Sequence, residues 1–179
     1  LVVDLGLPQN ASIFATEREV KRFEEILRSD ADIERWSTYV GQGAIRFYLP
    51  LNVQLPNPFF AQAVIVAKDV AARKRLEERL ETVLAEQFPQ VISRVAPLEL
   101  GPPVGWPVQF RVTGPDPTEV RAIALRLAQT VATDPATRRI NFDWMEPARE
   151  VRIDVDQDEA RLLGLSSDSV ASALNAAVT

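Results

Sequence analysis

The chain has 179 residues and is 46% hydrophobic, so it can bury a substantial core as one large domain or two small ones. Its 20 basic and 25 acidic residues are mixed along the sequence and give a formal net charge of -5, which argues against nucleic acid as a partner. Cysteine and histidine are absent, which excludes disulfides, thiolate nucleophiles, imidazole bases and the usual zinc ligands, and no apolar run approaches the ~20 residues that span a bilayer.

The beginning of the chain predicts a strand, a helix and a second strand. The run LVVDLGLP is β-branched and apolar and stops at Pro8, which is typical of a strand followed by a turn. Residues 10–30 then repeat apolar side chains at helical spacing, and Asn10 or Ser12 can cap this helix. The run IERWSTYVG predicts the second strand.

A third strand segment, a loop, another strand and a second helix follow. Residues 44–51, AIRFYLPL, are expected to turn back as a strand, whereas the prolines of residues 52–58 predict a loop. The largely apolar run FFAQAVIVAKD predicts a strand, and residues 70–88 have helical periodicity. The run PQVISRVAPLEL predicts one more strand.

After residue 101 the order of elements begins again. The segment GPPVGWP, rich in proline and glycine, is the best candidate for a domain boundary. The run VQFRVTG predicts a strand, and the next helix has Asp116 as cap and Pro117 at its first position. The runs RRINFDWM and REVRIDVD predict two strands. A short helix capped by Asp156 and ended by Gly164 follows, and then a helix over residues 166–178.

This order predicts the fold class α+β, with two ferredoxin-like split βαβ units in tandem. The first unit, residues 1–101, has the full set βαββαβ, whereas the second, residues 102–179, lacks its last strand. Such an incomplete unit would leave an unpaired sheet edge, which natural proteins cover or blunt. We therefore expect the missing strand farther along a longer parent chain.

The passage REVRIDVDQDEARLLGLSSDSVASALNAAV resembles the resistance-nodulation-division (RND) efflux transporters of the acriflavine-resistance family. In that family the corresponding passage leads from a periplasmic porter subdomain into the docking subdomain. The family's alternating strand, acidic helix start, Leu-Gly-hydrophobic stop and Ala-rich helix match residues 151–156, 158–164 and 166–177. The runs VDLGLPQNAS, YVGQGAIRFY and GWPVQFRVTGPD are also similar to the second periplasmic half of the family, so the resemblance covers essentially the whole chain.

The resemblance implies a periplasmic portion of a bacterial inner-membrane efflux pump, with a path for hydrophobic or amphiphilic small molecules. It also implies a proton-driven parent that forms a homotrimer and works with a periplasmic adaptor and an outer-membrane channel. The chain itself is then no enzyme and needs no cofactor. It carries no proton relay, because the family's relay residues have no positions in this sequence.

A first group of candidate substrate-path residues consists of Gly41, Gln42, Gly43, Phe47 and Tyr48. Glycine gives backbone freedom, and aromatic faces bind flat hydrophobic compounds without demanding one hydrogen-bond pattern. The alternative is a plain hairpin turn followed by aromatic residues of the core. The resemblance favours the substrate path, because the segment is similar to the switch loop that lines the drug entrance in the family.

A second group consists of Arg138, Arg139, Asn141 and Trp144. The resemblance places this segment in a strand bordering a cleft, where the polar side chains would meet polar parts of a substrate; a solvated strand edge is the alternative. Trp106 and Trp144 are candidates to line a cleft between two similar units, whereas Trp36 is expected in the core.

No metal site is expected. The acidic residues of segment 154–159 lack the glycine turn and the ligand series of a calcium loop, and helix capping accounts for part of them. Thioether sulfur is a ligand for soft cations such as copper and silver, and Met145 is the one methionine of the chain. A heavy-metal cargo is therefore disfavoured.

Two other functions occur on the same fold. An acylphosphatase-like enzyme would need an arginine, an asparagine and a glycine-rich anion loop after the first strand, but GLPQNAS offers one glycine and a proline without an amide hydrogen. An RNA-binding or small-ligand module is the other alternative. RNA recognition would require stacked aromatics and a basic surface, and the net charge has the opposite sign.

Overall fold

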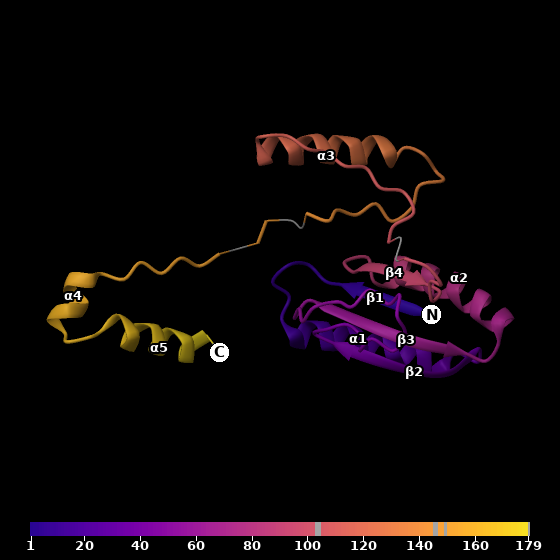
Figure 1. The fold of residues 1–179 in the computed structure, drawn as a ribbon, viewed down its shortest axis with the longest axis horizontal. Helices are drawn as coiled ribbons and strands as arrows, with labels where there is room; N and C mark the ends of the chain where they lie inside the picture. The colour runs from indigo at the N-terminus through magenta and orange to yellow at the C-terminus, as the bar shows by residue number, and fades with distance from the viewer. Residues whose placement is uncertain (103–104, 145–146, 149, 179) are drawn as a thin grey trace. The chain divides into compact units, whose positions relative to one another are not determined.

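The computed structural model describes residues 1–102, 105–144, 147–148 and 150–178 (Figure 1). The chain divides into two compact units, Leu1–Ala148 and Arg149–Thr179. The first unit contains all the β-structure of the described residues, and the second contains two short helices. No helix among the described residues is both long and apolar enough to cross a membrane.

A four-stranded antiparallel sheet organises the first unit. The elements run β1 (Val2–Gly6), α1 (Ile13–Ser29), β2 (Ile33–Val40), β3 (Phe60–Ala67), α2 (Val70–Gln87) and β4 (Ile92–Ala96). The strand order is β2-β3-β1-β4, and every neighbouring pair is antiparallel. Two crossovers through helices with this strand order make a split βαβ unit. The predicted α+β class and ferredoxin-like architecture are confirmed.

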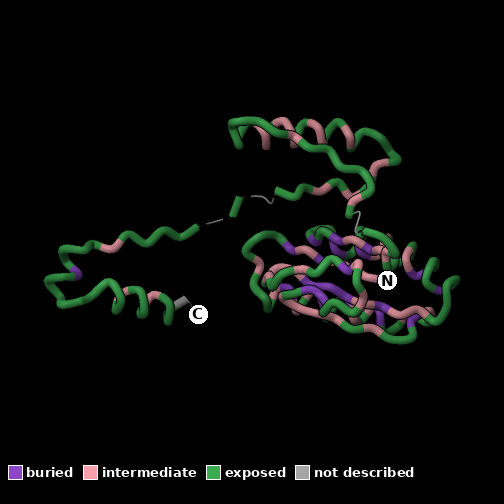
Figure 2. The backbone as a smooth tube through the Cα atoms, viewed as in Figure 1, coloured by how far each residue is buried: buried purple, intermediate pink, exposed green. Residues whose placement is uncertain are grey.

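The core lies between the sheet and its two helices, because every second strand residue points to that side. Val3 and Leu5 of β1 and Ala61, Ala63 and Ile65 of β3 are buried there. Three apolar side chains of each helix cover them, from α1 Val20, Phe23 and Leu27, and from α2 Leu76, Leu80 and Leu84. The buried positions gather in this part of the backbone in Figure 2.

Ion pairs tie α2 to the turn between α1 and β2. Arg79 binds Asp30 with Nη2 at 2.7 Å from Oδ1, and it also reaches Asp32. Arg75 places Nη2 at 2.5 Å from Oδ1 of Asp32. Hydrogen bonds from Arg75 and Arg79 lower the pKa of Asp32 to about 2. These bonds hold α2 against the turn that leads into β2, so charged partners from elements distant in sequence face each other.

Three helices follow the first sheet: α3 (Pro117–Val131), α4 (Gln157–Leu162) and α5 (Ser167–Val178). The predicted caps are confirmed, since Asp116 accepts from the N–H groups of Thr118 and Glu119 and Asp156 accepts from those of Asp158 and Glu159. Gly164 follows α4 with a φ of 71°. At the start of the chain, Ser12 caps α1 by accepting from the N–H of Ala15.

The strands predicted for residues 44–51, 108–114, 138–145 and 149–156 are wrong where the structure describes them, because these residues have no ladder partner. Met145 and Arg149 lie outside the described residues. Alternation of apolar side chains indicates an extended backbone, but a strand exists only where a second one pairs with it. The division into domains 1–101 and 102–179 stays a prediction, because the boundary segment includes Pro103 and Val104, which also lie outside the described residues.

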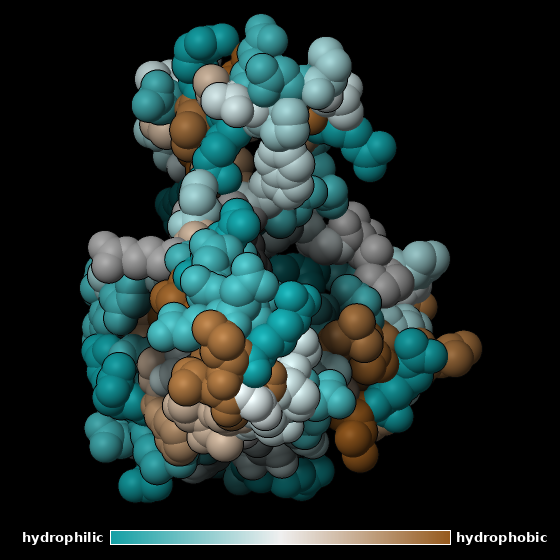
Figure 3. Space-filling model, turned by 90° about the vertical axis from the view of Figure 1, so that its left-hand side faces the viewer, coloured by the Kyte–Doolittle hydropathy of each residue, from teal (hydrophilic) through white to brown (hydrophobic). Residues whose placement is uncertain are grey.

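Many large apolar side chains outside the core are exposed, and Figure 3 shows hydrophobic residues among hydrophilic ones on the face that it draws. In the second unit Ala160 is buried, whereas Leu162 and Leu163 of the same turn are 88% and 68% exposed. Helix α3 buries none of its described residues fully. The packed core described here therefore belongs to residues 1–96 of the first unit.

We expect Leu80→Ala to lower the free energy of unfolding by about 2–5 kcal/mol, because the side chain is 1% exposed and its removal leaves a cavity between α2 and the sheet. Urea unfolding followed by circular dichroism measures the change. Leu100→Ala is the matched control, since Leu100 is 98% exposed, and its effect should stay within about 0.5 kcal/mol. Equal effects of the two substitutions would contradict the core described here.

Candidate functional site

The connection between β2 and β3, residues 41–59, is a long loop whose ends are held together; we call it the β2–β3 loop. The N–H of Gly41 donates to the carbonyl oxygen of Phe60 at 2.8 Å, and the N–H of Asn57 donates to that of Gly41 at 2.8 Å. The hydroxyl of Thr16 in α1 donates to the carbonyl oxygen of Pro58 at 2.6 Å. The two ends of the loop are therefore pinned to each other and to α1.

The two glycines at the start of the β2–β3 loop allow close packing. Gly41 has a φ of 75°, and a Cβ atom there would lie 2.9 Å from Cδ1 of Ile13. A Cβ atom on Gly43 would lie 2.8 Å from Cβ of Gln54 and 3.2 Å from its backbone nitrogen. Gly43 is buried, whereas Gln42 between the two glycines is exposed. The glycines therefore let the two halves of the loop lie against each other and against α1.

The middle of the β2–β3 loop presents apolar side chains to solvent. The rings of Phe47 and Tyr48 contact each other, with centroids 5.4 Å apart and planes at 36°. Phe47 is 47% exposed, so it is not the core aromatic of the alternative interpretation. The other exposed apolar side chains of the loop are Ile45, Leu49, Val53 and Leu55. This concentration of exposed apolar side chains in one loop makes it a candidate binding surface.

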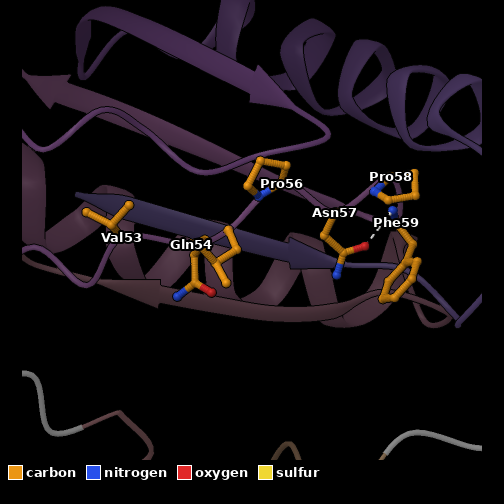
Figure 4. A pocket seen from close by; sticks show the side chains of 7 residues that line it. Val53, Gln54, Pro56, Asn57, Pro58 and Phe59 are labelled. Carbon is orange, nitrogen blue, oxygen red and sulfur yellow. Dashed lines mark hydrogen bonds between the residues drawn. The ribbon is translucent and has the colours of Figure 1, made fainter.

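The second half of the β2–β3 loop lines an open cavity of about 590 Å³ (Figure 4). Its lining consists of Val53, Gln54, Leu55, Pro56, Asn57, Pro58 and Phe59. Asn57 stabilises the turn here, since its Oδ1 accepts from the N–H of Phe59 at 3.1 Å. The sequence predicted only a loop at residues 52–58. The available signal was the alternation of Val53 and Leu55 with polar residues in a segment that prolines bar from a sheet.

A buried hydrogen-bond relay lies between the β2–β3 loop and the sheet. The N–H of Ala44 donates to Oε1 of Gln62 at 2.8 Å, and Nε2 of Gln62 donates to Oδ1 of Asp4 at 2.7 Å. Arg94 of β4 is the cross-strand partner of Asp4 and forms an ion pair with Glu99 at 2.7 Å. Burial raises the pKa of Asp4, although the Gln62 hydrogen bond and the charge of Arg94 oppose the rise.

Sequence reasoning missed both side chains of this relay. Their signal was a polar residue inside an apolar strand, Asp4 in LVVDLGL and Gln62 in FFAQAVIVA. A polar side chain in such a run is either on the wet face of the sheet or buried with a hydrogen-bond partner. Gln62, at 3% exposure, is the second case.

The second predicted group does not form a common site with the first one. Nδ2 of Asn141 donates to the carbonyl oxygen of Arg139 at 2.9 Å, and Arg139, with a φ of 56°, lies 3.2 Å from Glu81 of α2. Arg138 and Trp144 are exposed. Within the described residues, no hydrogen bond, ion pair or ring contact joins this group to the β2–β3 loop.

The other tryptophans and the acidic segment have local roles. Trp36 packs against the core as predicted, and the carbonyl oxygen of Trp106 accepts from Gln109. In the acidic segment, Asp154 pairs with Arg152 and Asp158 pairs with Arg161. Within the described residues there is no cluster of three acidic side chains that could hold a metal ion. Met145, on which the argument about heavy metals depends, lies outside them.

Comparison with known proteins identifies the class of protein that this fold and loop belong to. The sequence matches the model of the AcrB/AcrD/AcrF family over residues 1–179, and the chain belongs to that family. The resemblance to RND efflux transporters is thereby confirmed. A comparison with curated proteins gives no match.

A solved structure described as "X-ray crystal structure of a heavy metal efflux pump, crystal form I" is similar in fold. The TM-score is 0.63 at 16% sequence identity, and the match covers 97% of this chain and 19% of the pump chain. At this identity the likeness concerns the fold alone. The chain therefore spans about a fifth of the length of that pump.

We expect Gly43→Ala to lower the free energy of unfolding by about 1–3 kcal/mol, because the added methyl group would overlap Gln54 and push the halves of the loop apart. Thermal and urea unfolding measure the change. Gly101→Ala is the matched control, since a Cβ atom there meets nothing within 4 Å. A Gly43→Ala variant as stable as Gly101→Ala would contradict the close packing of the loop.

The relay also predicts a pH dependence. Because the folded-state pKa of Asp4 lies above its ordinary value of 3.8, its contribution to stability is fully present below pH 3.8 and is lost as the pH rises through the raised pKa. The free energy of unfolding of the wild type, minus that of Asp4→Asn, should therefore fall as the pH rises through this window. Urea unfolding at a series of pH values gives the difference, and a flat curve would contradict the burial of the carboxyl group.

Proposed function

We propose that the chain is a periplasmic portion of a proton-driven RND multidrug efflux pump of the bacterial inner membrane, and that it contributes part of the substrate entrance and binding cleft for organic amphiphiles. In this proposal residues 1–101 and 102–179 are porter subdomains of a longer transporter. The family assignment over the whole chain and the 19% coverage of the similar pump support a place within a larger protein.

The exposed apolar surface of the β2–β3 loop is the observation that carries the proposal. Phe47 and Tyr48 offer two aromatic rings in contact, and the cavity beside Leu55 and Phe59 is lined mainly by apolar atoms and proline rings. Such a surface binds flat hydrophobic compounds by contact area, with few directional demands. Gly41 and Gly43 allow the close packing at the start of this surface, and Gln42 between them is exposed.

The second group of candidates takes a separate part in the proposal. Arg138 and Trp144 are exposed and offer a cation and an aromatic ring, whereas Arg139 and Asn141 shape the backbone around them. An amphiphile has both an apolar and a polar part, so residues of this kind would complement the apolar loop. We propose that they meet polar parts of the substrate.

The parent protein proposed here is a homotrimer that works with a periplasmic adaptor and an outer-membrane channel. The AcrB/AcrD/AcrF family consists of transporters, so substrate passes through without chemical change. The cargo of this chain is proposed to be organic, since the loop offers carbon surface and ring faces.

An acylphosphatase-like activity finds no support in the turn after β1. There the N–H of Ala11 donates to the carbonyl oxygen of Pro8 at 3.0 Å, so this amide is engaged within the turn, and Pro8 has no N–H of its own. A phosphate cradle needs several free amide hydrogens pointing to one place. We therefore keep the transporter proposal.

Titration of the intrinsic tryptophan fluorescence with a rhodamine or acridine dye tests the proposed function. We expect saturable quenching at micromolar dye, and about fivefold weaker binding for Phe47→Ala, since an aromatic contact is worth about 1 kcal/mol. Val70→Ala is the control, because it removes an exposed apolar side chain at the start of α2, away from the loop. Trp144→Ala reports separately on the second group.

Absence of saturable quenching would remove the support for a binding surface in this chain. Equal weakening by Phe47→Ala and Val70→Ala would show that the dye binds exposed apolar residues without preference for the loop.

A further inference from the structure

The side chain of Gln62 lies on the face of the sheet that has no helix. Its neighbours Ala61 and Ala63 in β3 point into the core beneath α1 and α2, so Gln62 points to the opposite side. It is nevertheless 3% exposed, and Ala44 and Leu51 of the β2–β3 loop are buried as well. The loop therefore covers this part of the sheet, with Gln62 beneath it.

The partners of Gln62 leave its amide one orientation. The N–H of Ala44 can only donate, so it requires the oxygen Oε1, and the carboxylate of Asp4 can only accept, so it requires the nitrogen Nε2. Within the described residues no buried side-chain nitrogen or oxygen lacks a hydrogen-bond partner. Asp4 therefore acts on the loop from another strand, through the amide of Gln62.

This relay holds the part of the loop that carries the aromatic residues. The ends of the loop are pinned near Gly41 and Pro58, whereas the bond from Ala44 to Gln62 is the one hydrogen bond that joins residues 42–53 to the sheet within the described part of the chain. Phe47 and Tyr48 follow a few residues after Ala44. The position of Ala44 on the sheet thus sets where their rings can lie.

We propose that Asp4 and Gln62 are positioning residues of the substrate-binding surface, which hold the β2–β3 loop against the sheet through the N–H of Ala44 and thereby place Phe47 and Tyr48. The consequence for binding rests on the proposed function. The hydrogen bonds that hold the loop against the sheet do not depend on that function, and they can be tested without any ligand.

Substitutions that swap the amide of Gln62 and the carboxylate of Asp4 test the relay. In Gln62→Glu two carboxylates face each other and the donor to Asp4 is lost. The new carboxylate can still accept from Ala44, but at a pH where both carboxyl groups are ionised their repulsion should push it, and the loop with it, off the sheet. In Asp4→Asn an amide replaces the carboxylate and can still accept from Nε2, so the loop should stay. In the double variant Asp4→Asn with Gln62→Glu, the new amide donates to the new carboxylate, which still accepts from Ala44. Arg94 with its partner Glu99, and Tyr39 across from Gln62, are the same in all variants.

Hydrogen exchange of the Ala44 amide, followed by NMR, is the readout. We expect exchange about tenfold or more faster in Gln62→Glu, close to the wild-type rate in Asp4→Asn, and slow again in the double variant, since groups in one network couple strongly. The amides of β1 and β3 serve as internal references for the folded sheet. Unchanged exchange in Gln62→Glu, or a double variant no slower than Gln62→Glu, would overturn the proposal.

Gln62→Met keeps the experiment decisive if Gln62→Glu does not fold. Methionine has a similar length and no strong donor or acceptor, so the Ala44 amide should again exchange about tenfold faster while the sheet remains folded. Wild-type exchange in this variant would overturn the proposal.

Dye affinity in the same variants shows whether the relay also positions the binding surface, in addition to holding the loop against the sheet. Loss of affinity in Gln62→Glu with recovery in the double variant would support the positioning role. Affinity that stays constant while Ala44 exchange changes would overturn it. If the wild type binds no dye, the proposed function fails, while the exchange data still decide whether the relay holds the loop.

Discussion

Among the described residues, α1 and α2 pack on one face of the first unit's sheet, and the β2–β3 loop covers the opposite face at Gln62. Val3, Ala63 and Ile65 are sealed beneath α1 and α2, but Gln62 on the other face lies in a central strand, with water excluded from its amide. A buried amide without partners costs about 1–3 kcal/mol. The β2–β3 loop covers Gln62 and supplies one of its partners, because the N–H of Ala44 donates to Oε1, while Asp4 of β1 accepts from Nε2.

A loop that covers a sheet in this way cannot bury all of its own side chains. Its inner residues, such as Ala44 and Leu51, pack downward, and its outer apolar residues, such as Phe47 and Leu55, are left exposed to solvent. Thr16 and Gly41 fix where the loop ends, so the exposed side chains keep a defined place. The binding surface that we propose follows from this division between an inner side that stabilises the sheet and an outer side that is free to bind.

Local signals predicted the helices well, because caps and apolar periodicity act within a few residues, as at Ser12 and Asp116. The strands predicted beyond residue 101 are wrong where the structure describes them, since pairing depends on a partner strand that no local sequence pattern specifies. The strand predicted for residues 44–51 is wrong for a related reason, because their apolar side chains suit a strand and a loop that covers a sheet equally well. In the candidate site, Phe47 was predicted from its aromatic ring beside a glycine-rich segment and from the resemblance to the family's switch loop, whereas Gln62 was missed because its partners come from distant segments.

The central claim is that the outer side of the β2–β3 loop binds organic amphiphiles, and chemical-shift mapping tests it most directly. The protein, labelled with ¹⁵N, is titrated with a cationic aromatic dye, and backbone amide shifts are followed residue by residue. The account predicts that the largest saturable changes lie in residues 45–59, with the solvent-facing sides of α1 and α2 unaffected. Saturable changes confined to those helices, or no saturable change in the loop, would contradict it.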